Sequence, residues 1–423
     1  MTRHFLFLQG VASPFFGRLA DHLRARGERI TKINFCAGDR AYWGTRPAVS
    51  YRGTVDGLDD YLQQIFAEND FTDLVLFGSH RPVHRPAIAL AEAANVRVHV
   101  FEEGYVRPNW VTLERGGVNA DSLLPRDPDW YLHVDPQLPR YADGKTAHSD
   151  IRIRAAHDLA YHASNGLNPL LYPGYRTHRP HVAAVEYAGW LRRFSALAWR
   201  RENDRRRIHA VNTGTDPFFI LPLQLNGDTQ ITLNSRYGGM PRLIDTVLRC
   251  FAVHAPAQSK LVIKNHPLDT GLVDYPALLT GLERELGLAG RVIYLETGLL
   301  PDLLEHAAGV VTVNSTAGMI ALAHGRPMIT LGAAIYNLPG LTFQGQLRDF
   351  WENAEQPVRR LFRAFRNTVI HTTQVNGDFY TRRGIAMAVT NSDRLLAPQS
   401  PLQELMALYP PNLHTADPRE SAR

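Results

Sequence analysis

Short apolar runs alternate with amphipathic segments over most of this chain. In its N-terminal part the apolar runs predict strands at residues 4–9, 29–35, 73–77 and 97–101. The helix between the first two strands is predicted to have Ser13 as its N-cap and Pro14 as its first residue, and Gly27 marks its end. A second helix is predicted at residues 86–94. Alternation of this kind indicates a parallel sheet.

The same alternation returns after residue 205. Strands are predicted at residues 218–223, 260–264, 292–295, 310–313 and 328–331. Helices are predicted between them at residues 241–254, 275–286, 300–307 and 318–324. The stretch in between, 104–205, is less regular and is interpreted as long loops and helices that complete the first domain. From residue 346 the chain is predicted to be helical to 397, followed by a polar, Pro-rich tail.

The predicted fold class is therefore α/β, with two doubly wound, Rossmann-like domains and C-terminal helices. The expected divisions are 1–205, 206–345, 346–397 and 398–423. At about 100–200 residues per domain, a length of 423 residues also favours two domains. This two-lobed pattern suggests the glycosyltransferase architecture called GT-B, in which a cleft separates the lobes. Other two-lobed α/β enzymes share the pattern, so it does not by itself give a function.

Composition and charge narrow the class of protein. Hydrophobic residues make up 44% and charged residues 21% of the chain, as in ordinary globular proteins. The two cysteines, Cys36 and Cys250, exclude a disulfide framework and favour a reducing compartment. The N-terminal apolar stretch is too short for a signal peptide, and no run is long enough to span a membrane, so a cytoplasmic location is expected. The net charge of +5 fits either a solvated surface or an anionic partner.

Polar side chains follow three of the predicted strands in the second half. Gln224, Asp228 and Gln230 follow the first of these strands, although a plain turn would use similar residues. Ligands of open α/β sheets bind beyond the carboxyl ends of the strands, so residues in these positions are candidates for a binding site.

The ends of two other predicted strands also carry candidate binding residues. Lys264, His266 and Pro267 follow one strand, and a surface loop is the alternative interpretation. A further group, Asn314, Ser315 and Thr316, follows another strand and opens a helix, where ordinary N-capping needs the same residue types. Together the three groups predict a pocket for a nucleotide monophosphate or diphosphate.

The first half offers one comparable strand end, which carries Glu102, Glu103, Gly104, Tyr105 and Arg107. A salt-bridged loop is the alternative there. No phosphate-binding G-x-x-x-x-G-K-[ST] loop, G-x-G-x-x-G fingerprint, H-E-x-x-H motif or paired cysteines are present, nor a D-x-D pattern suited to a metal-bound sugar nucleotide. We therefore expect neither a metal nor a redox cofactor.

These motifs resemble those of the KpsS/LipB-type capsule polysaccharide biosynthesis and export proteins. The resemblance extends over about residues 1–395. It is carried by the runs PFFGRLADHLRARGERITKINFCAGD, EEGYVRPNWVTLERGGVN, FFILPLQLNGDTQI, KNHPLDTG, VNSTAGMIALAHGRPMITLGAAIYNLPGLTFQGQLRDFW and HTTQVNGDFYTRRG. It implies a retaining β-Kdo glycosyltransferase of GT-B fold. Such an enzyme takes Kdo from CMP-β-Kdo and starts a poly-Kdo linker on a phosphatidylglycerol-type lipid at the inner membrane.

The resemblance also implies roles for individual residues in the second half. His266-Pro267 and Ser315-Thr316 would hold the CMP side of the donor, with Thr316 standing where related enzymes carry a second serine. Gln224, Asn314 and Gln230 would line the donor site, and Asp228 matches the nucleophile position. His266, Ser315 and Thr316 would stabilise the leaving-group charge in place of a metal.

In the first half, the family's E-G-Y-x-R-P motif falls on residues 103–108. Retention requires two inversions, hence a carboxylate nucleophile and a second group that cycles between acid and base. Glu103 is the expected acid/base, with Glu102 as the neighbour not distinguished from it. The substrate would also contact Gly104 and Tyr105, and Arg107 or Lys264 would pair with the Kdo carboxylate.

Two basic stretches with interleaved aromatic residues, 190–207 and 359–366, complete the picture. Solvated helix faces account for them, but contact with anionic lipid headgroups is the functional alternative. The expected partners are CMP-Kdo, the lipid acceptor, the inner-membrane surface and other capsule proteins, without nucleic acid. Two other functions stay open: a CMP-releasing transferase that uses a CDP-linked polyol, and a non-catalytic adaptor of an export assembly.

Overall fold

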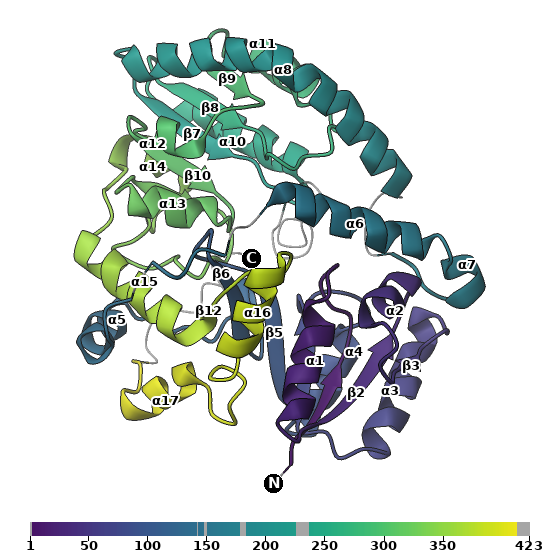
Figure 1. Ribbon diagram of the computed structural model, residues 1–423. Coiled ribbons are helices and arrows are strands. Elements are labelled where there is room, and N and C mark those ends of the chain that lie inside the picture. Colours follow the sequence, from purple (N-terminus) through teal and green to yellow (C-terminus); the bar gives the residue numbers. More distant parts are fainter. Residues whose placement is uncertain (1, 142, 148–149, 178–182, 226–236, 413–423) are drawn as a thin grey trace. The chain divides into compact units, whose positions relative to one another are not determined.

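The computed structural model describes residues 2–141, 143–147, 150–177, 183–225 and 237–412 (Figure 1). The chain divides into two compact units. The first contains Met1–Leu124, Pro136–His178 and Asn367–Pro411, and the second contains Pro125–Asp135, Arg179–Arg366 and Asn412–Arg423. Each unit is an α/β structure, as the alternation of strands and helices predicts.

The first unit is built on a seven-stranded sheet with the order β12-β6-β5-β4-β1-β2-β3. Neighbours from β3 to β5 pair in parallel, whereas β6 and β12 are antiparallel to their neighbours. The order reverses between β1 and β4, which makes the sheet doubly wound. The strands are β1 (His4–Phe7), β2 (Arg29–Asn34), β3 (Val49–Ser50), β4 (Asp73–Phe77), β5 (Arg97–Glu103), β6 (Trp110–Arg115) and β12 (Gln374–Asn376).

The central strands β1 and β4 are buried on both faces, so after a polar first residue they are continuously apolar rather than alternating. Because successive side chains point to opposite faces, Phe5 and Phe7 pack in one core and Leu6 and Leu8 in the other. The first core includes α1 (Phe15–Ala25) and α16 (Arg382–Asn391). The second includes α3 (Leu58–Ala67) and α4 (Arg85–Ala93). The remaining α-helices here are α2 (Ala37–Trp43), α6 (Ile151–Asn165), α7 (Asn168–Leu171) and α17 (Pro401–Leu408).

The second unit is built on a five-stranded parallel sheet with the order β11-β10-β7-β8-β9. The order reverses between β7 and β10. Its strands are β7 (Phe218–Pro222), β8 (Lys260–Lys264), β9 (Val292–Leu295), β10 (Gly309–Thr312) and β11 (Met328–Thr330). The sheet is therefore doubly wound as well, and the prediction of two Rossmann-like units is confirmed.

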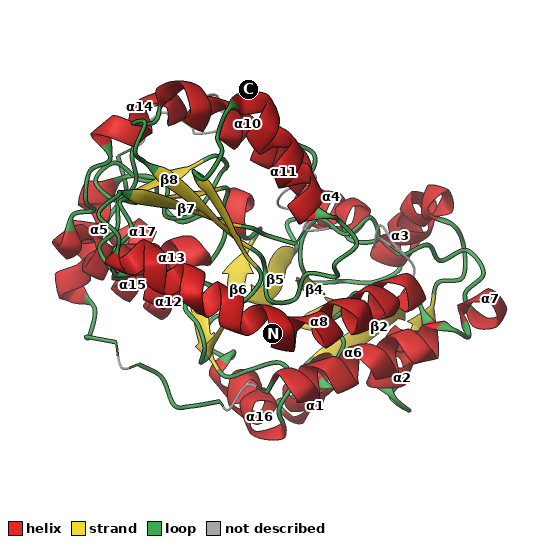
Figure 2. Ribbon diagram, turned by 90° about the horizontal axis from the view of Figure 1, so that it is seen from above, coloured by secondary structure: helices red, strands yellow, loops and turns green. Residues whose placement is uncertain are grey.

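Helices lie on both sides of this sheet (Figure 2). On one side α10 (Met240–His254), α11 (Tyr275–Leu286) and α14 (Leu347–Asn353) pack against β7, β8 and β10 in one apolar core. On the other side lie α12 (Leu300–Leu304) and α13 (Ala317–Ala323). The 31-residue helix α8 (Ala183–Thr213) contacts α12. The ring of Tyr131 in α5 (Pro128–Val134) meets Phe365 in α15 (Arg359–Thr373), with centroids 5.1 Å apart.

The predicted domain boundaries differ from this division. Residue 205 falls inside α8, so the second unit begins earlier in the sequence. The C-terminal helices are not a separate part, because α14 joins the core of the second unit and β12 and α16 join the first. Part of the predicted tail forms the helix α17 (Pro401–Leu408). A capping box between Ser400 and Gln403 stabilises the start of this helix.

The start predicted for α1 is one residue too early. The helix begins at Phe15, and Pro14 occupies the N-cap position. Ser13 still stabilises the helix start, because its Oγ accepts a hydrogen bond from the Phe15 N–H at 3.2 Å.

Candidate functional site

Two polar side chains meet where the strand order of the second sheet reverses. Gln224 follows β7 and Asn314 follows β10. The Gln224 side-chain amide donates to Asn314 Oδ1 at 3.1 Å, and the Asn314 N–H donates to Gln224 Oε1 at 3.4 Å. Both are buried. The structure thus brings two of the predicted motifs into contact at the point where doubly wound sheets bind their ligands.

The third motif follows β8, the strand that pairs with β7. His266 Nδ1 accepts a hydrogen bond from the Leu268 N–H at 3.1 Å. A neutral ring with an accepting Nδ1 carries its proton on Nε2, so this contact assigns the tautomer. Pro267 is exposed. Lys264 is buried, and its Nζ donates to the Asn265 carbonyl at 3.2 Å. Burial, followed by the charge of Arg193, lowers the pKa of Lys264.

Ser315 and Thr316 lie directly before α13 and are half-buried. Ser315 Oγ accepts a hydrogen bond from the Ala317 N–H at 3.1 Å, and the Ser315 carbonyl accepts one from the Tyr336 hydroxyl at 2.5 Å. A Cβ at Gly318 would lie 2.3 Å from the Tyr336 hydroxyl oxygen, so only glycine fits there. These contacts fix the backbone that carries both hydroxyls.

Asp228 and Gln230 lie outside the described residues. Their roles as nucleophile and donor contact stay predictions from the sequence.

In the first unit, Glu103 ends β5 and lines a cavity of about 130 Å³. Glu103 Oε1 accepts a hydrogen bond from the Tyr380 hydroxyl at 3.0 Å and forms an ion pair with Arg154 Nη1, also at 3.0 Å. Arg107 Nη2 is 4.0 Å from Oε2. The cavity is lined by Glu103, Arg107, Pro108, Trp110, Val111, Arg154, Gly377, Asp378, Phe379 and Tyr380.

Tyr380 and Arg154 were missed by sequence reasoning. Tyr380 is buried, and burial together with the charge of Glu103 raises its pKa well above the usual value, so it remains a donor to Glu103. The Arg154 guanidinium lies over the Tyr380 ring, 5.0 Å from its centroid. Tyr380 belongs to a run that carries the family resemblance, which was a usable signal. Arg154 lies in α6, and no motif marks it.

The neighbours of Glu103 serve mainly to build the loop between β5 and β6. A Cβ at Gly104 would lie 2.0 Å from the Trp110 carbonyl oxygen, so this turn requires glycine. The buried Tyr105 donates its hydroxyl to Glu114 at 2.5 Å. Arg107 is exposed and lines the cavity, whereas Glu102 is not among its lining residues. Of the two adjacent carboxylates, Glu103 is the one that faces this cavity.

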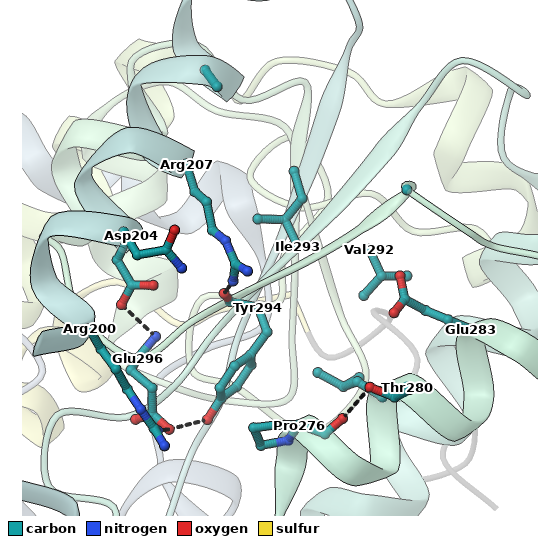
Figure 3. A pocket seen from close by; sticks show the side chains of 14 residues that line it. Arg200, Asp204, Arg207, Pro276, Thr280, Glu283, Val292, Ile293, Tyr294 and Glu296 are labelled. Carbon is teal, nitrogen blue, oxygen red and sulfur yellow. Dashed lines mark hydrogen bonds and ion pairs between the residues drawn. The ribbon is translucent and has the colours of Figure 1, made fainter. Parts of the chain in front are cut away.

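A larger cavity, about 560 Å³, lies in the second unit between α8, α11 and the edge strand β9 (Figure 3). Arg207 Nη1 donates to the Tyr294 carbonyl at 3.0 Å, which satisfies a backbone group on the outer edge of β9. The Tyr294 hydroxyl donates to Glu296 at 2.9 Å. None of the site residues predicted from the sequence lines this cavity.

With this geometry in hand, comparison with known proteins identifies the family. The sequence model of the capsule polysaccharide biosynthesis protein family matches residues 72–380. The chain belongs to this family. It is 36% identical over 383 residues to the capsule polysaccharide export protein KpsS of Escherichia coli, covering 89% of this chain and 97% of that protein.

Two further similarities complete the comparison. The capsule polysaccharide modification protein LipB of Neisseria meningitidis serogroup B is also 36% identical, with 90% of this chain and 92% of LipB covered. Among solved structures, the β-Kdo 2,7 transferase of Thermosulfurimonas dismutans KpsC gives a TM-score of 0.43 at 13% identity, covering 96% of this chain and 98% of that chain.

The basic stretch 190–207 of this capsule-family protein lies on α8 and has two different faces. Arg193 is buried, and Trp190, Arg200 and Arg207 make hydrogen bonds within the second unit. The other side is exposed. It comprises Leu191, Arg192, Phe194, Trp199, Arg201, Glu202, Arg205 and Arg206, hereafter the outer face of α8. Glu202 pairs with Arg205 and Arg206, and Arg192 donates to the Gly271 carbonyl.

The second basic stretch differs from the sequence interpretation. Its aromatic residues, Phe362 and Phe365, are buried, because they lie on the inward side of the amphipathic helix α15. Only arginines such as Arg359, Arg360 and Arg363 are exposed there. In the described part of the chain, no three or more His, Cys, Asp or Glu side chains form a cluster that could hold a metal ion. No helix within the described ranges is long and apolar enough to cross a membrane.

Proposed function

We propose that this protein is a retaining β-Kdo glycosyltransferase that transfers Kdo from CMP-β-Kdo to a phosphatidylglycerol-type lipid and so starts the poly-Kdo linker of a capsule. The observation that carries the proposal is the contact between Gln224 and Asn314 at the reversal point of the second sheet, with His266 on the adjacent strand end. Membership of the capsule polysaccharide biosynthesis family supports the biological setting. The names of the relatives, an export protein and a modification protein, fit a step in capsule assembly.

The second unit is proposed to hold CMP without a metal. His266 would donate from Nε2 to the phosphate, and the hydroxyls of Ser315 and Thr316 would add further hydrogen bonds. Donors fixed in place before the reaction stabilise the charge that develops on the leaving phosphate. The backbone contacts of Ser315 and the assigned tautomer of His266 support this arrangement.

Transfer with retention is proposed to proceed in two displacements. In the first, the Asp228 carboxylate bonds to the anomeric carbon of Kdo and the bond to the CMP phosphate breaks. In the second, an acceptor hydroxyl bonds to that carbon, the bond to Asp228 breaks, and Glu103 takes the hydroxyl proton. Tyr380 and Arg154 both bind Oε1 of Glu103, so we assign the proton transfer to Oε2, which Arg107 approaches at 4.0 Å.

The outer face of α8 is proposed to bind the anionic membrane that carries the acceptor. Its side chains include Trp199, which is 88% exposed, and Leu191, which is 74% exposed. Basic residues near an anionic membrane surface contribute about 1 kcal/mol each, and apolar side chains add to this when buried. The arginines of α15 would add charge but not apolar contact.

Mass spectrometry of the lipid tests the proposed reaction. The protein is incubated with vesicles containing phosphatidylglycerol and either CMP-Kdo or CDP-glycerol. We expect CMP-Kdo to add one Kdo to the lipid and CDP-glycerol to leave it unchanged. Modification with CDP-glycerol alone would favour the polyol transferase. No modification with either donor, at a protein concentration that binds CMP, would favour the non-catalytic adaptor.

Co-sedimentation with phosphatidylglycerol vesicles at rising salt tests the membrane surface separately. We expect Leu191→Ser combined with Trp199→Ser to weaken binding about tenfold or more, because both side chains lose their burial in the bilayer. Val253→Ser is the matched control, since Val253 is 75% exposed on α10. Equal binding by wild type and the double variant would contradict this surface.

A further inference from the structure

The loop after β8, residues 266–271, accepts hydrogen bonds from two arginines of α8, and the buried one, Arg193, makes most of them. The exposed one, Arg192, donates to the Gly271 carbonyl. The Arg193 guanidinium donates to the carbonyls of His266 at 3.2 Å, Pro267 at 3.0 Å and Asp269 at 2.9 Å. Its side chain is only 3% exposed. Three peptide carbonyls of the loop are therefore fixed by a planar, charged donor, which holds directions more strictly than a neutral side chain does.

The charge of Arg193 is balanced by Glu296, which follows β9. Arg193 Nε donates to Glu296 Oε2 at 2.9 Å, and Asn265 Nδ2 donates to the same oxygen at 3.2 Å. Asn265 Oδ1 in turn accepts from the His266 N–H at 2.8 Å. Burial alone would raise the pKa of Glu296, but Arg193 and the other donors outweigh it and keep the pKa below the usual value.

Other residues of α8 hold the same loop. The Trp190 indole donates to the Leu268 carbonyl at 3.2 Å. A Cβ at Gly189 would lie 2.3 Å from the Thr270 carbonyl oxygen, so the helix and the loop are in close backbone contact. Asp204 Oδ2 accepts from the Glu296 N–H at 3.1 Å, which anchors the base of the network (Figure 3). The loop is therefore tied to α8 along most of its length.

We propose that Arg193 and Glu296 are positioning residues that orient His266 toward the phosphate of a bound nucleotide. The proposal rests on the proposed function, in which His266 binds the CMP phosphate. A buried ion pair is costly to desolvate, and an apolar pair of the same size often stabilises a fold as well. Here Arg193 donates to the carbonyls of His266 and Pro267. Glu296 accepts from Asn265 Nδ2, and Asn265 Oδ1 accepts from the His266 N–H. An apolar pair would provide neither set of contacts.

Calorimetric titration with CMP compares variants that differ in one contact. We expect Arg193→Met to weaken CMP binding at least tenfold. Arg200→Met is the matched control: Arg200 lies on the same helix and pairs with the same Glu296 at 3.1 Å, but it is 44% exposed and donates to no loop carbonyl in the described residues. It should change CMP affinity less than twofold. Trp190→Phe removes one loop hydrogen bond and should weaken binding two- to fivefold.

A double-variant cycle separates positioning from a general loss of structure. If Arg193 acts through His266, then Arg193→Met should weaken CMP binding less than threefold further in a His266→Ala background. Fully multiplicative losses would overturn the proposal. If Arg193→Met does not fold, the cycle is run with two milder variants. Arg193→Lys keeps the positive charge, and Trp190→Phe keeps the aromatic packing.

Nuclear magnetic resonance of histidine-labelled protein gives a readout that does not need CMP. The His266 ring signals, assigned with His266→Ala, report whether Nδ1 still accepts a hydrogen bond. We expect Arg193→Met to shift them and Arg200→Met to leave them unchanged. Unchanged signals in Arg193→Met would overturn the positioning role. If Arg193→Met shifts the His266 signals but the wild-type protein does not bind CMP, the result would instead contradict the proposed donor.

Discussion

A glutamine occupies the same place in both units, yet the two glutamines have opposite surroundings. Gln9 follows β1 in the first unit as Gln224 follows β7 in the second, each two residues beyond the first strand of a doubly wound sheet. Gln224 bonds to Asn314 across the reversal point of its own sheet. Gln9, by contrast, is enclosed by side chains from outside the sheet.

The enclosure of Gln9 comes from α6 and the segment after it. The Gln9 amide donates to the Tyr161 hydroxyl at 3.2 Å and lies 3.4 Å from the Tyr175 hydroxyl. The Tyr161 hydroxyl in turn donates to Asp39 at 2.9 Å. The ends of β1 and β2 are therefore filled by the protein itself. The first unit has its cavity at the end of β5 instead, where Glu103 lies.

The two sheets show that a shared reversal of strand order does not by itself determine the position of a functional site. A glutamine lies at the reversal point of both sheets, but in the first unit side chains from α6 and the segment after it surround that glutamine.

The first prediction concerns Asp228, six residues beyond the end of β7. Asp228→Ala should abolish Kdo transfer while CMP affinity stays within about twofold, because the nucleophile bonds to the sugar and not to the phosphate. Asp228→Asn should lower the rate by several orders of magnitude, since an amide is a poor nucleophile. Intact-protein mass spectrometry of wild type with CMP-Kdo and no acceptor should show one Kdo on the peptide with Asp228. An adduct on Glu103 would reverse the two assignments.

The second prediction tests the cavity of the first unit. Glu103→Gln should lower kcat by about 10²–10⁴-fold, the range typical of a lost general base. Tyr380→Phe removes one donor to Glu103 and should lower kcat by about tenfold, the effect of losing one hydrogen bond to a charged group. Neither change should alter CMP affinity in calorimetry. The control is Tyr105→Phe, whose hydroxyl contacts Glu114 rather than Glu103, and whose kcat should change less than that of Tyr380→Phe.

How far the sequence predicts this architecture depends on the range of the contacts. Buried parallel strands such as β4 and β8 are continuous apolar runs bounded by polar residues, so their bounds follow from local pattern. The strand-end motifs at Gln224, His266 and Asn314 were predictable for the same reason. The two-lobed α/β class followed as well.

Contacts between distant parts of the sequence were not predictable. Arg192 and Arg193 are adjacent and chemically equal, but Arg192 is exposed and reaches the Gly271 carbonyl, whereas Arg193 is buried and binds three loop carbonyls more than 70 residues away. Tyr380 reaches Glu103 across 277 positions. The three-residue strand β12 pairs with β6 over a similar separation and has no local signature. Such contacts depend on which side of a helix faces the core or on which strand lies at the edge of the folded sheet. A short stretch of sequence contains neither piece of information.

The third prediction compares the two glutamines directly. Gln224→Ala should weaken CMP binding by about 1–3 kcal/mol, because it removes the side-chain hydrogen bonds between Gln224 and Asn314 at the binding site. Gln9→Ala should lower the free energy of unfolding by a similar amount but leave CMP affinity unchanged. Thermal denaturation and calorimetry on both variants measure the two effects. A loss of CMP affinity in Gln9→Ala would contradict the proposed difference between the two reversal points.

The fourth prediction concerns the buried histidine His99 of the first unit. His99 in β5 donates from Nε2 to Asp73 at 2.7 Å, and its Nδ1 is buried without a hydrogen-bond partner among the described residues. Burial therefore lowers the pKa of His99 to about 4 from an ordinary value of 6.5. Between these two pH values the unfolded chain binds a proton that the folded chain does not, so stability falls as the pH falls through this window.

The lost stability should amount to about 3 kcal/mol at most, from a pKa difference of about 2.5. Denaturant unfolding of wild type and His99→Gln between pH 7 and pH 4 measures it. Glutamine keeps an N–H donor for Asp73 but does not titrate, so the variant should lose less stability on acidification. The difference between the two proteins should vanish above pH 7, apart from a constant packing term. Parallel curves over the whole range would show that His99 does not make the first unit acid-sensitive.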